Sequence, residues 1–175
     1  MGRMGNIKRN DIILYAVSIM LCAASYIILN KNIELSLLPH KMALEYLFDY
    51  RFVFVENVGY EQSNGLFIVA QNCLGAKLFI NLFLIMVFGF LHKYTGTKQK
   101  IATVVKFYCV AFVLAFVVTI IRIAVSLPFC GWDMFHLVHN IISLVIYFMA
   151  GLVLYFIMER RTKQREKTDV FNTTG

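Results

Sequence analysis

Four long apolar segments constrain the fold of this 175-residue chain more than any other feature. They cover Ile12–Leu29, Leu74–Leu91, Ile101–Leu127 and Leu137–Met158. Each approaches or exceeds the ~20 residues that a helix needs to cross the hydrocarbon core of a bilayer. A small soluble domain has no core large enough for a chain that is 59% hydrophobic and 15% charged. We therefore predict an all-α, polytopic membrane bundle of about four transmembrane helices, which forms one domain over residues 1–175.

The positions of the basic residues predict how this bundle is oriented. Twelve of the 17 lysines and arginines lie in residues 1–11, 93–106 and 159–175, which flank the same ends of the apolar segments. Basic residues accumulate on the cytoplasmic side, so both termini are expected in the cytoplasm and the 30–72 loop outside the plasma membrane. The role of the basic residues in orienting the helices, beside the lipid bilayer, explains the net charge of +7. The charge therefore does not require a nucleic-acid partner.

The loop over residues 30–72 is expected to be structured. Met42–Phe48 places its apolar residues at helical spacing, which suits a short helix in the membrane interface. Phe52–Val55 and Leu66–Val69 are short β-prone runs, and the polar stretch between them ends in Asn64-Gly65. This pattern favours a small hairpin or a re-entrant lid. Because the loop leads directly into Cys73, it is expected to form one wall of any site there.

Three residues of the types used in thiol-based acyl transfer are expected at one face of the membrane. Cys73 precedes the second apolar segment, Arg122 lies near the end of the third, and His139 lies near the start of the last. Chain direction reverses at each crossing, so these three positions share the outer side. A thiol, a guanidinium and an imidazole in one place make a candidate catalytic site.

Cys73 is the candidate nucleophile. It is expected at the N-terminus of a helix, where the helix dipole and a nearby Lys77 favour the thiolate, and Gly75 allows a close approach of substrate or backbone. Two alternatives stay open: packing at the membrane boundary, and a disulfide with Cys130. The remaining two cysteines, Cys22 and Cys109, lie inside apolar segments and are expected to be packing residues.

Arg122 and the histidines supply the other candidate groups. An ionised side chain in an apolar run costs roughly 2 kcal/mol or more near the bilayer centre, which favours a functional role for Arg122 over snorkelling to the headgroups. His136 and His139 stand three residues apart, so either is able to take a thiol proton. A zinc site built from Cys73, His136, His139 and Asp133 is a further alternative.

These motifs, in this order, resemble the exosortase/archaeosortase family, and the short chain resembles the small exosortase K type. The resemblance covers roughly Phe52–Tyr155. It rests on Asn72-Cys73-Leu74-Gly75, then Ile121-Arg122-Ile123-Ala124, then His139 followed by Ser143, Tyr147 and Phe148.

The resemblance implies a membrane-embedded cysteine transpeptidase or protease without a metal or organic cofactor. Its substrates would be exported proteins whose C-terminus carries a short motif, a transmembrane helix and a basic tail. The resemblance assigns Cys73 as nucleophile, His139 as general acid and base, and Arg122 as the group that stabilises the thiolate or oxyanion. The alternative is a non-enzymatic membrane protein, a transporter subunit or an assembly factor, in which Arg122 binds an anionic solute or lipid.

Overall fold

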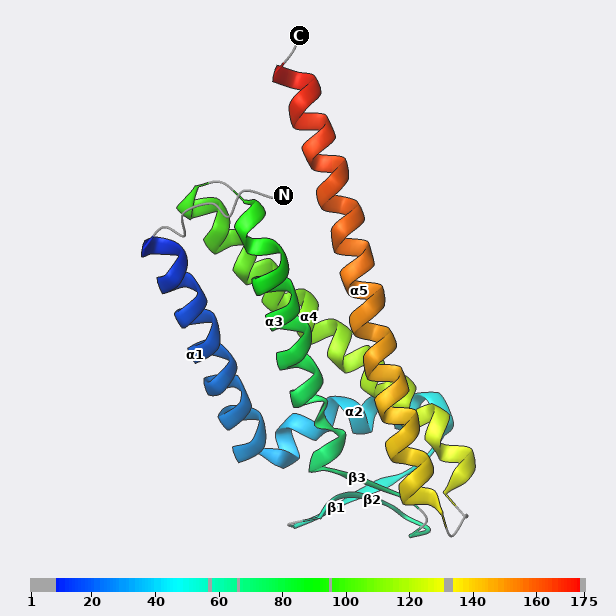
Figure 1. Ribbon diagram of the computed structural model, residues 1–175. Coiled ribbons are helices and arrows are strands. Elements are labelled where there is room, and N and C mark those ends of the chain that lie inside the picture. The colour runs from blue at the N-terminus through cyan, green and yellow to red at the C-terminus, as the bar shows by residue number, and fades with distance from the viewer. Residues whose placement is uncertain (1–8, 57, 66, 95, 131–133, 174–175) are drawn as a thin grey trace.

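The computed structural model describes residues 9–56, 58–65, 67–94, 96–130 and 134–173. In this part of the chain, five α-helices and a three-stranded sheet follow one another along the sequence (Figure 1). The helices are α1 (Arg9–Lys31), α2 (Ile33–Phe48), α3 (Ala76–Phe90), α4 (Thr97–Ser126) and α5 (Phe135–Thr173). The strands are β1 (Phe52–Val55), β2 (Gly59–Gln62) and β3 (Ile68–Ala70). Short 3-10 helices are η1 (Gln71–Leu74), η2 (Leu91–Lys93) and η3 (Leu127–Phe129).

The helices α1, α3, α4 and α5 are long and apolar enough to cross a membrane, which confirms the predicted multi-pass bundle. Among them α3 is the central helix, and its Phe79, Phe83 and Met86 lie fully buried in the core. Large apolar side chains such as Met20 on α1 and Leu144 on α5 instead point out of the bundle. This outward apolar surface is what a lipid environment requires.

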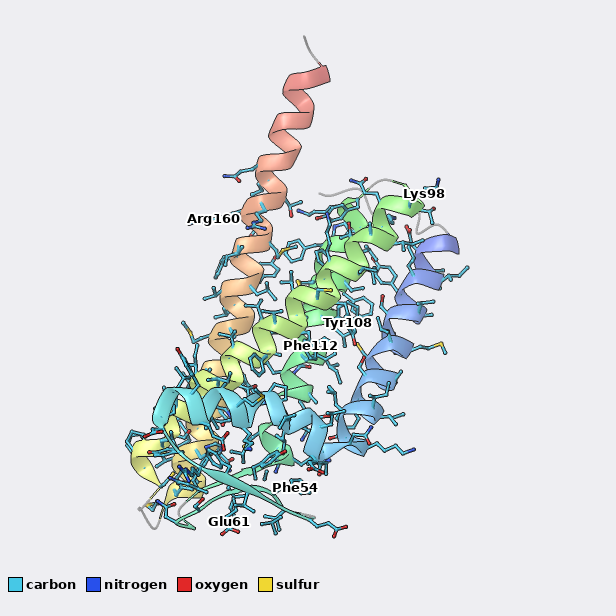
Figure 2. The ribbon with its side chains drawn as sticks, turned by 180° about the vertical axis from the view of Figure 1, so that it is seen from behind. Phe54, Glu61, Lys98, Tyr108, Phe112 and Arg160 are labelled. Carbon is cyan, nitrogen blue, oxygen red and sulfur yellow. The ribbon has the colours of Figure 1, made fainter. Side chains whose placement is uncertain are left out.

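The two ends of the bundle differ in structure and in charge. The sheet and α2 lie together at one end, whereas α1 begins and α5 ends at the opposite end (Figure 1). Lys98 and Arg160 lie at that opposite end, and Phe54 and Glu61 lie at the sheet end (Figure 2). The basic clusters that contain Lys98 and Arg160 therefore belong, in their described residues, to the end that is remote from the sheet.

The sheet end is more elaborate than the sequence pattern indicated. The helix expected over Met42–Phe48 is present, but it begins at Ile33 as α2. The two expected β-prone runs do not pair with each other, because β2 lies between β1 and β3 in an antiparallel sheet. Asn64-Gly65 belongs to the β2–β3 turn, where Gly65 adopts a positive φ of 73°.

Apolar packing joins the sheet to α2 and to η1. The inner face of the sheet carries buried Phe52, Tyr60 and Val69, and these pack in one cluster with Leu37 and Leu44 of α2. The same cluster contains Cys73 and Ile123, so it connects the sheet to the N-terminal side of α3 and to α4. This second core holds the candidate site residues in place.

His40 of α2 is buried in the same region. Its side chain is 4% exposed, and its ring packs edge-on against Phe116 of α4 at 4.8 Å between centroids. Burial, together with a smaller effect of the positive charge of Arg122, lowers the pKa of His40 from 6.5 to about 4. The imidazole is therefore neutral at physiological pH.

The low pKa of His40 predicts a pH-dependent stability. In the unfolded chain His40 binds a proton below about pH 6.5, whereas in the folded protein it binds one only near pH 4. Its contribution to stability is thus complete above pH 6.5 and is lost as the pH falls toward 4, by about 3 kcal/mol. Thermal melting of the detergent-purified protein at pH 7, 5.5 and 4 measures this loss. His40→Leu should show a smaller fall in melting temperature than the wild type; equal falls would contradict the prediction.

Candidate active site

Cys73 lies in η1, the single turn that connects β3 to α3. Its side chain is 6% exposed. The prediction that Cys73 begins a helix is wrong in detail, because α3 begins only at Ala76. Gly75 adopts a left-handed conformation, with φ 65°, which ends η1 and starts α3 in a new direction. Cys73 therefore precedes the α-helix by one tight turn.

Gly75 also sets the distance between this turn and α4. A Cβ atom at Gly75 would collide with Oγ1 of Thr119 and would lie 3.4 Å from the carbonyl oxygen of Ala115. The absence of a side chain thus allows the Cys73 turn to pack directly on α4. The sequence-based expectation that Gly75 permits a close approach is confirmed, and the approaching group is a neighbouring helix.

Arg122 of α4 points into the protein instead of reaching toward lipid headgroups. Its side chain is 4% exposed, and Nη1 donates a hydrogen bond of 2.7 Å to the hydroxyl of Tyr147 on α5. The guanidinium also lies over the Tyr147 ring, at 5.3 Å from its centroid. Nη2 donates a long bond of 3.4 Å to the carbonyl oxygen of Asn72, the residue before Cys73. Arg122 is therefore held between α5 and the Cys73 turn.

His139 of α5 is oriented by a serine of α4. Its Nδ1 lies 3.0 Å from Oγ of Ser126, and this hydroxyl donates a bond of 2.8 Å to the carbonyl oxygen of Arg122. A hydroxyl has only one proton to donate, so Oγ accepts from an Nδ1–H group in this arrangement. The tautomer assigned in this way places the ring's lone pair on Nε2, as a general base requires.

One pocket brings the three candidate residues together. Its volume is about 630 Å³, and Cys73, Arg122 and His139 all line it, from η1, α4 and α5. Lys77, which was expected to support the thiolate, lines the same pocket with an exposed side chain. The predicted meeting of a thiol, a guanidinium and an imidazole at one end of the bundle is thus present in the structure, and their catalytic roles stay predictions.

The other three cysteines are not among the described residues that line this pocket. Cys73 and Cys130 are both free thiols, so the alternative of a disulfide between them is not realised in the structure. Burial raises the pKa of the Cys130 thiol, which makes it a poorer nucleophile at neutral pH. Cys22 packs in the core of the bundle as expected, whereas Cys109 points outward and does not.

The zinc alternative depends on residues at the start of α5. Asp133 and the side chain of His136 lie outside the described residues. The choice between His136 and His139 as the base therefore depends on a side chain that the structure does not describe. Within the described part of the chain, no three His, Cys, Asp or Glu side chains gather closely enough to hold a metal ion.

Two further residues belong to the site although no role was derived for them from the sequence pattern. Ser126 orients His139, and Tyr147 holds Arg122. Ser126 follows Arg122 by four residues and therefore lies on the same side of α4, a spacing that was open to sequence reasoning. The pairing of Tyr147 with Arg122 depends on how α4 and α5 cross, which no local pattern reports.

Comparison of the chain with protein-family models, with curated proteins and with solved structures finds no match.

Proposed function

We propose that this protein is a membrane-embedded cysteine transpeptidase or protease that cleaves the C-terminal sorting signals of exported proteins. The observation that carries the proposal is the shared pocket of Cys73, Arg122 and His139. Ile68 and Ala70 of β3 line the pocket, which therefore lies at the sheet end, whereas Lys98 and Arg160 lie at the opposite end (Figure 2). The positive-inside rule thus favours an extracytoplasmic active site with both termini in the cytoplasm. The motif order resembling exosortases supports the same activity.

The chemistry begins with the thiol of Cys73. Nε2 of His139 takes the thiol proton, and the thiolate attacks the carbonyl carbon of the scissile peptide bond. The electron pair of the C=O bond moves onto oxygen, and the N–H groups of Arg122 stabilise this oxyanion. Collapse of the intermediate breaks the C–N bond, and the imidazolium of His139 gives its proton to the leaving amine. A thioester on Cys73 remains.

The second half of the reaction releases the thioester. An acceptor amine, hydroxyl or water attacks the thioester carbonyl while His139 takes its proton, and the Cys73 thiolate leaves and is reprotonated. A substrate tail that consists of one apolar helix and a basic end would lie beside the bundle in the bilayer. Its scissile bond would then reach the level of the pocket without leaving the membrane surface. No metal or organic cofactor takes part in these steps.

A tailed reporter tests the proposal directly. The reporter is an exported domain followed by a juxtamembrane segment, an apolar helix and a basic tail, and a panel of juxtamembrane sequences is co-expressed with the protein. We expect at least one reporter to be cleaved and an acyl group to be found on Cys73 by mass spectrometry. The non-enzymatic alternative, in which Arg122 binds an anionic solute or lipid, predicts intact reporters throughout and no acylated Cys73.

Ser126→Ala should impair the reaction through His139. The substitution removes the acceptor of the Nδ1–H bond, so the imidazole loses its fixed orientation and tautomer. We expect kcat to fall about tenfold and the pH dependence of kcat to shift, with KM nearly unchanged. Ser18→Ala is the matched control, because Ser18 is also a buried serine whose hydroxyl donates to the carbonyl oxygen of Leu14 in its own helix at 2.8 Å, and it is not among the described residues that line the pocket. Equal effects of the two substitutions would argue against a specific role of Ser126.

A further inference from the structure

The strand β3 ends next to the candidate nucleophile and has one free edge. In the described part of the chain β3 pairs only with β2, so it is an edge strand of the sheet. The chain passes from Ala70 directly into η1, which contains Cys73. A polypeptide that paired with this edge would therefore lie in line with the Cys73 turn.

The register of the sheet tells which main-chain groups of β3 are unpaired. Gln62 donates its N–H to the carbonyl oxygen of Phe67 at 2.9 Å, and Tyr60 lies opposite Val69. In an antiparallel ladder, hydrogen-bonded residues alternate, so Phe67 and Val69 direct their N–H and C=O groups toward β2. Ile68 directs both of its groups, and Ala70 its N–H, away from β2.

This free edge borders the candidate active site. Ile68 and Ala70 line the same 630 Å³ pocket as Cys73, Arg122 and His139. The side chain of Val69 is buried against α2, whereas that of Ile68 is 41% exposed. Volumes of ~300–1,000 Å³ are usual for ligand sites, so the pocket has room for a short peptide segment. An edge strand that lines the same pocket as a cysteine thiol is an arrangement that favours strand addition by an extended peptide.

We propose that the substrate segment around the scissile bond binds as an extended strand on the free edge of β3. Main-chain groups of the substrate would pair with Ile68 and with the N–H of Ala70, and this pairing would deliver the scissile carbonyl to Cys73. The inference rests on the proposed function and defines its substrate class as unfolded, extended polypeptide. Only alternate substrate side chains would then face the pocket, so sequence preference would recur at every second residue.

Proline at position 68 tests the protein side of this pairing. Ile68→Pro removes an N–H group that points away from β2 and leaves the ladder to β2 intact, because proline is tolerated on the free side of an edge strand. We expect KM for a cleaved peptide to rise about tenfold with little change in kcat. Ile68→Ala is the matched control, because it removes the side chain and keeps the N–H. Ala70→Pro is the second variant, at a residue whose φ is −87°.

N-methylation of the substrate tests the same pairing without altering the protein. Synthetic peptides that span the mapped cleavage site of a processed reporter, each with one N-methylated residue, are assayed with the full-length wild-type protein in lipid nanodiscs. Strand addition predicts that kcat/KM falls at every second position and is nearly unchanged between them. A uniform profile, or losses without a period of two, together with normal kinetics of Ile68→Pro, would overturn strand addition.

The two proposals fail in different ways. If reporters are cleaved and Cys73 becomes acylated while the N-methyl profile is flat, the transpeptidase proposal stands and strand addition is wrong. If none of the reporters is cleaved by the wild-type protein, the transpeptidase proposal is wrong and the substrate inference is lost with it. Pairing of two β3 edges between copies of the protein would appear as a dimer that Ile68→Pro dissociates, an outcome that also overturns substrate pairing.

Discussion

Cys73→Ala is expected to abolish cleavage of every tailed reporter that the wild-type protein processes. The alanine variant has no thiol to attack the peptide carbonyl and cannot form the thioester, so the rate should fall at least about a thousandfold. Cys73 is 6% exposed and lies in a packed cluster, and its replacement by alanine removes a single heavy atom. The fold should therefore survive, and cleavage is measured by immunoblotting of the reporter.

Cys130→Ala is the matched control for this experiment. Cys130 is a free thiol that packs at the edge of the same cluster, but it is not among the described residues that line the pocket. We expect normal cleavage with this variant and continued acylation of Cys73. Cleavage that persists in Cys73→Ala, or that is lost equally in both variants, would refute a nucleophilic role for Cys73.

The transmembrane part of the fold was predictable because apolar composition and length report it directly. The expected segment Ile12–Leu29 lies inside α1, and Ile101–Leu127 coincides closely with α4. The sheet was less accessible to sequence reasoning. β2 consists of Gly-Tyr-Glu-Gln, which has neither the β-branched residues nor the alternation that marks a strand, and it forms because β1 and β3 lie on either side of it.

The residues that form the site could be predicted from the sequence better than the way in which they are arranged. The alternation of chain direction across a bilayer placed Cys73, Arg122 and His139 at one end of the bundle, and they line one pocket there. The local geometry at Cys73 was not predictable, because the left-handed conformation of Gly75 separates the cysteine from α3. The hydrogen bonds from Ser126 and Tyr147 arise where α4 meets α5, so they depend on tertiary packing.

Substitution of Tyr147 perturbs Arg122 less than removal of the guanidinium does, so the two changes can be compared. Its hydroxyl accepts the 2.7 Å bond from Nη1, and its ring lies against the guanidinium. Tyr147→Phe keeps the ring and removes the hydroxyl, so Arg122 should retain its charge and its hydrogen bond to the carbonyl oxygen of Asn72 but lose the hydrogen bond to Tyr147. The resulting loss of kcat should be smaller than that caused by removal of the guanidinium itself.

Arg122→Gln is expected to lower kcat by about a hundred- to a thousandfold, the usual cost of removing an oxyanion donor. Within the described residues, Nη1 and Nη2 have partners and Nε has none, so the guanidinium keeps donor capacity for a developing negative charge. Glutamine retains polarity but not the charge, and Arg122→Lys restores the charge without the planar fork, so it should recover only part of the rate. Single-turnover kinetics of thioester formation separate these effects from product release.

If Arg122→Gln instead raised KM and left kcat unchanged, the guanidinium would serve to bind a substrate anion in the ground state, because only an interaction that strengthens in the transition state changes kcat.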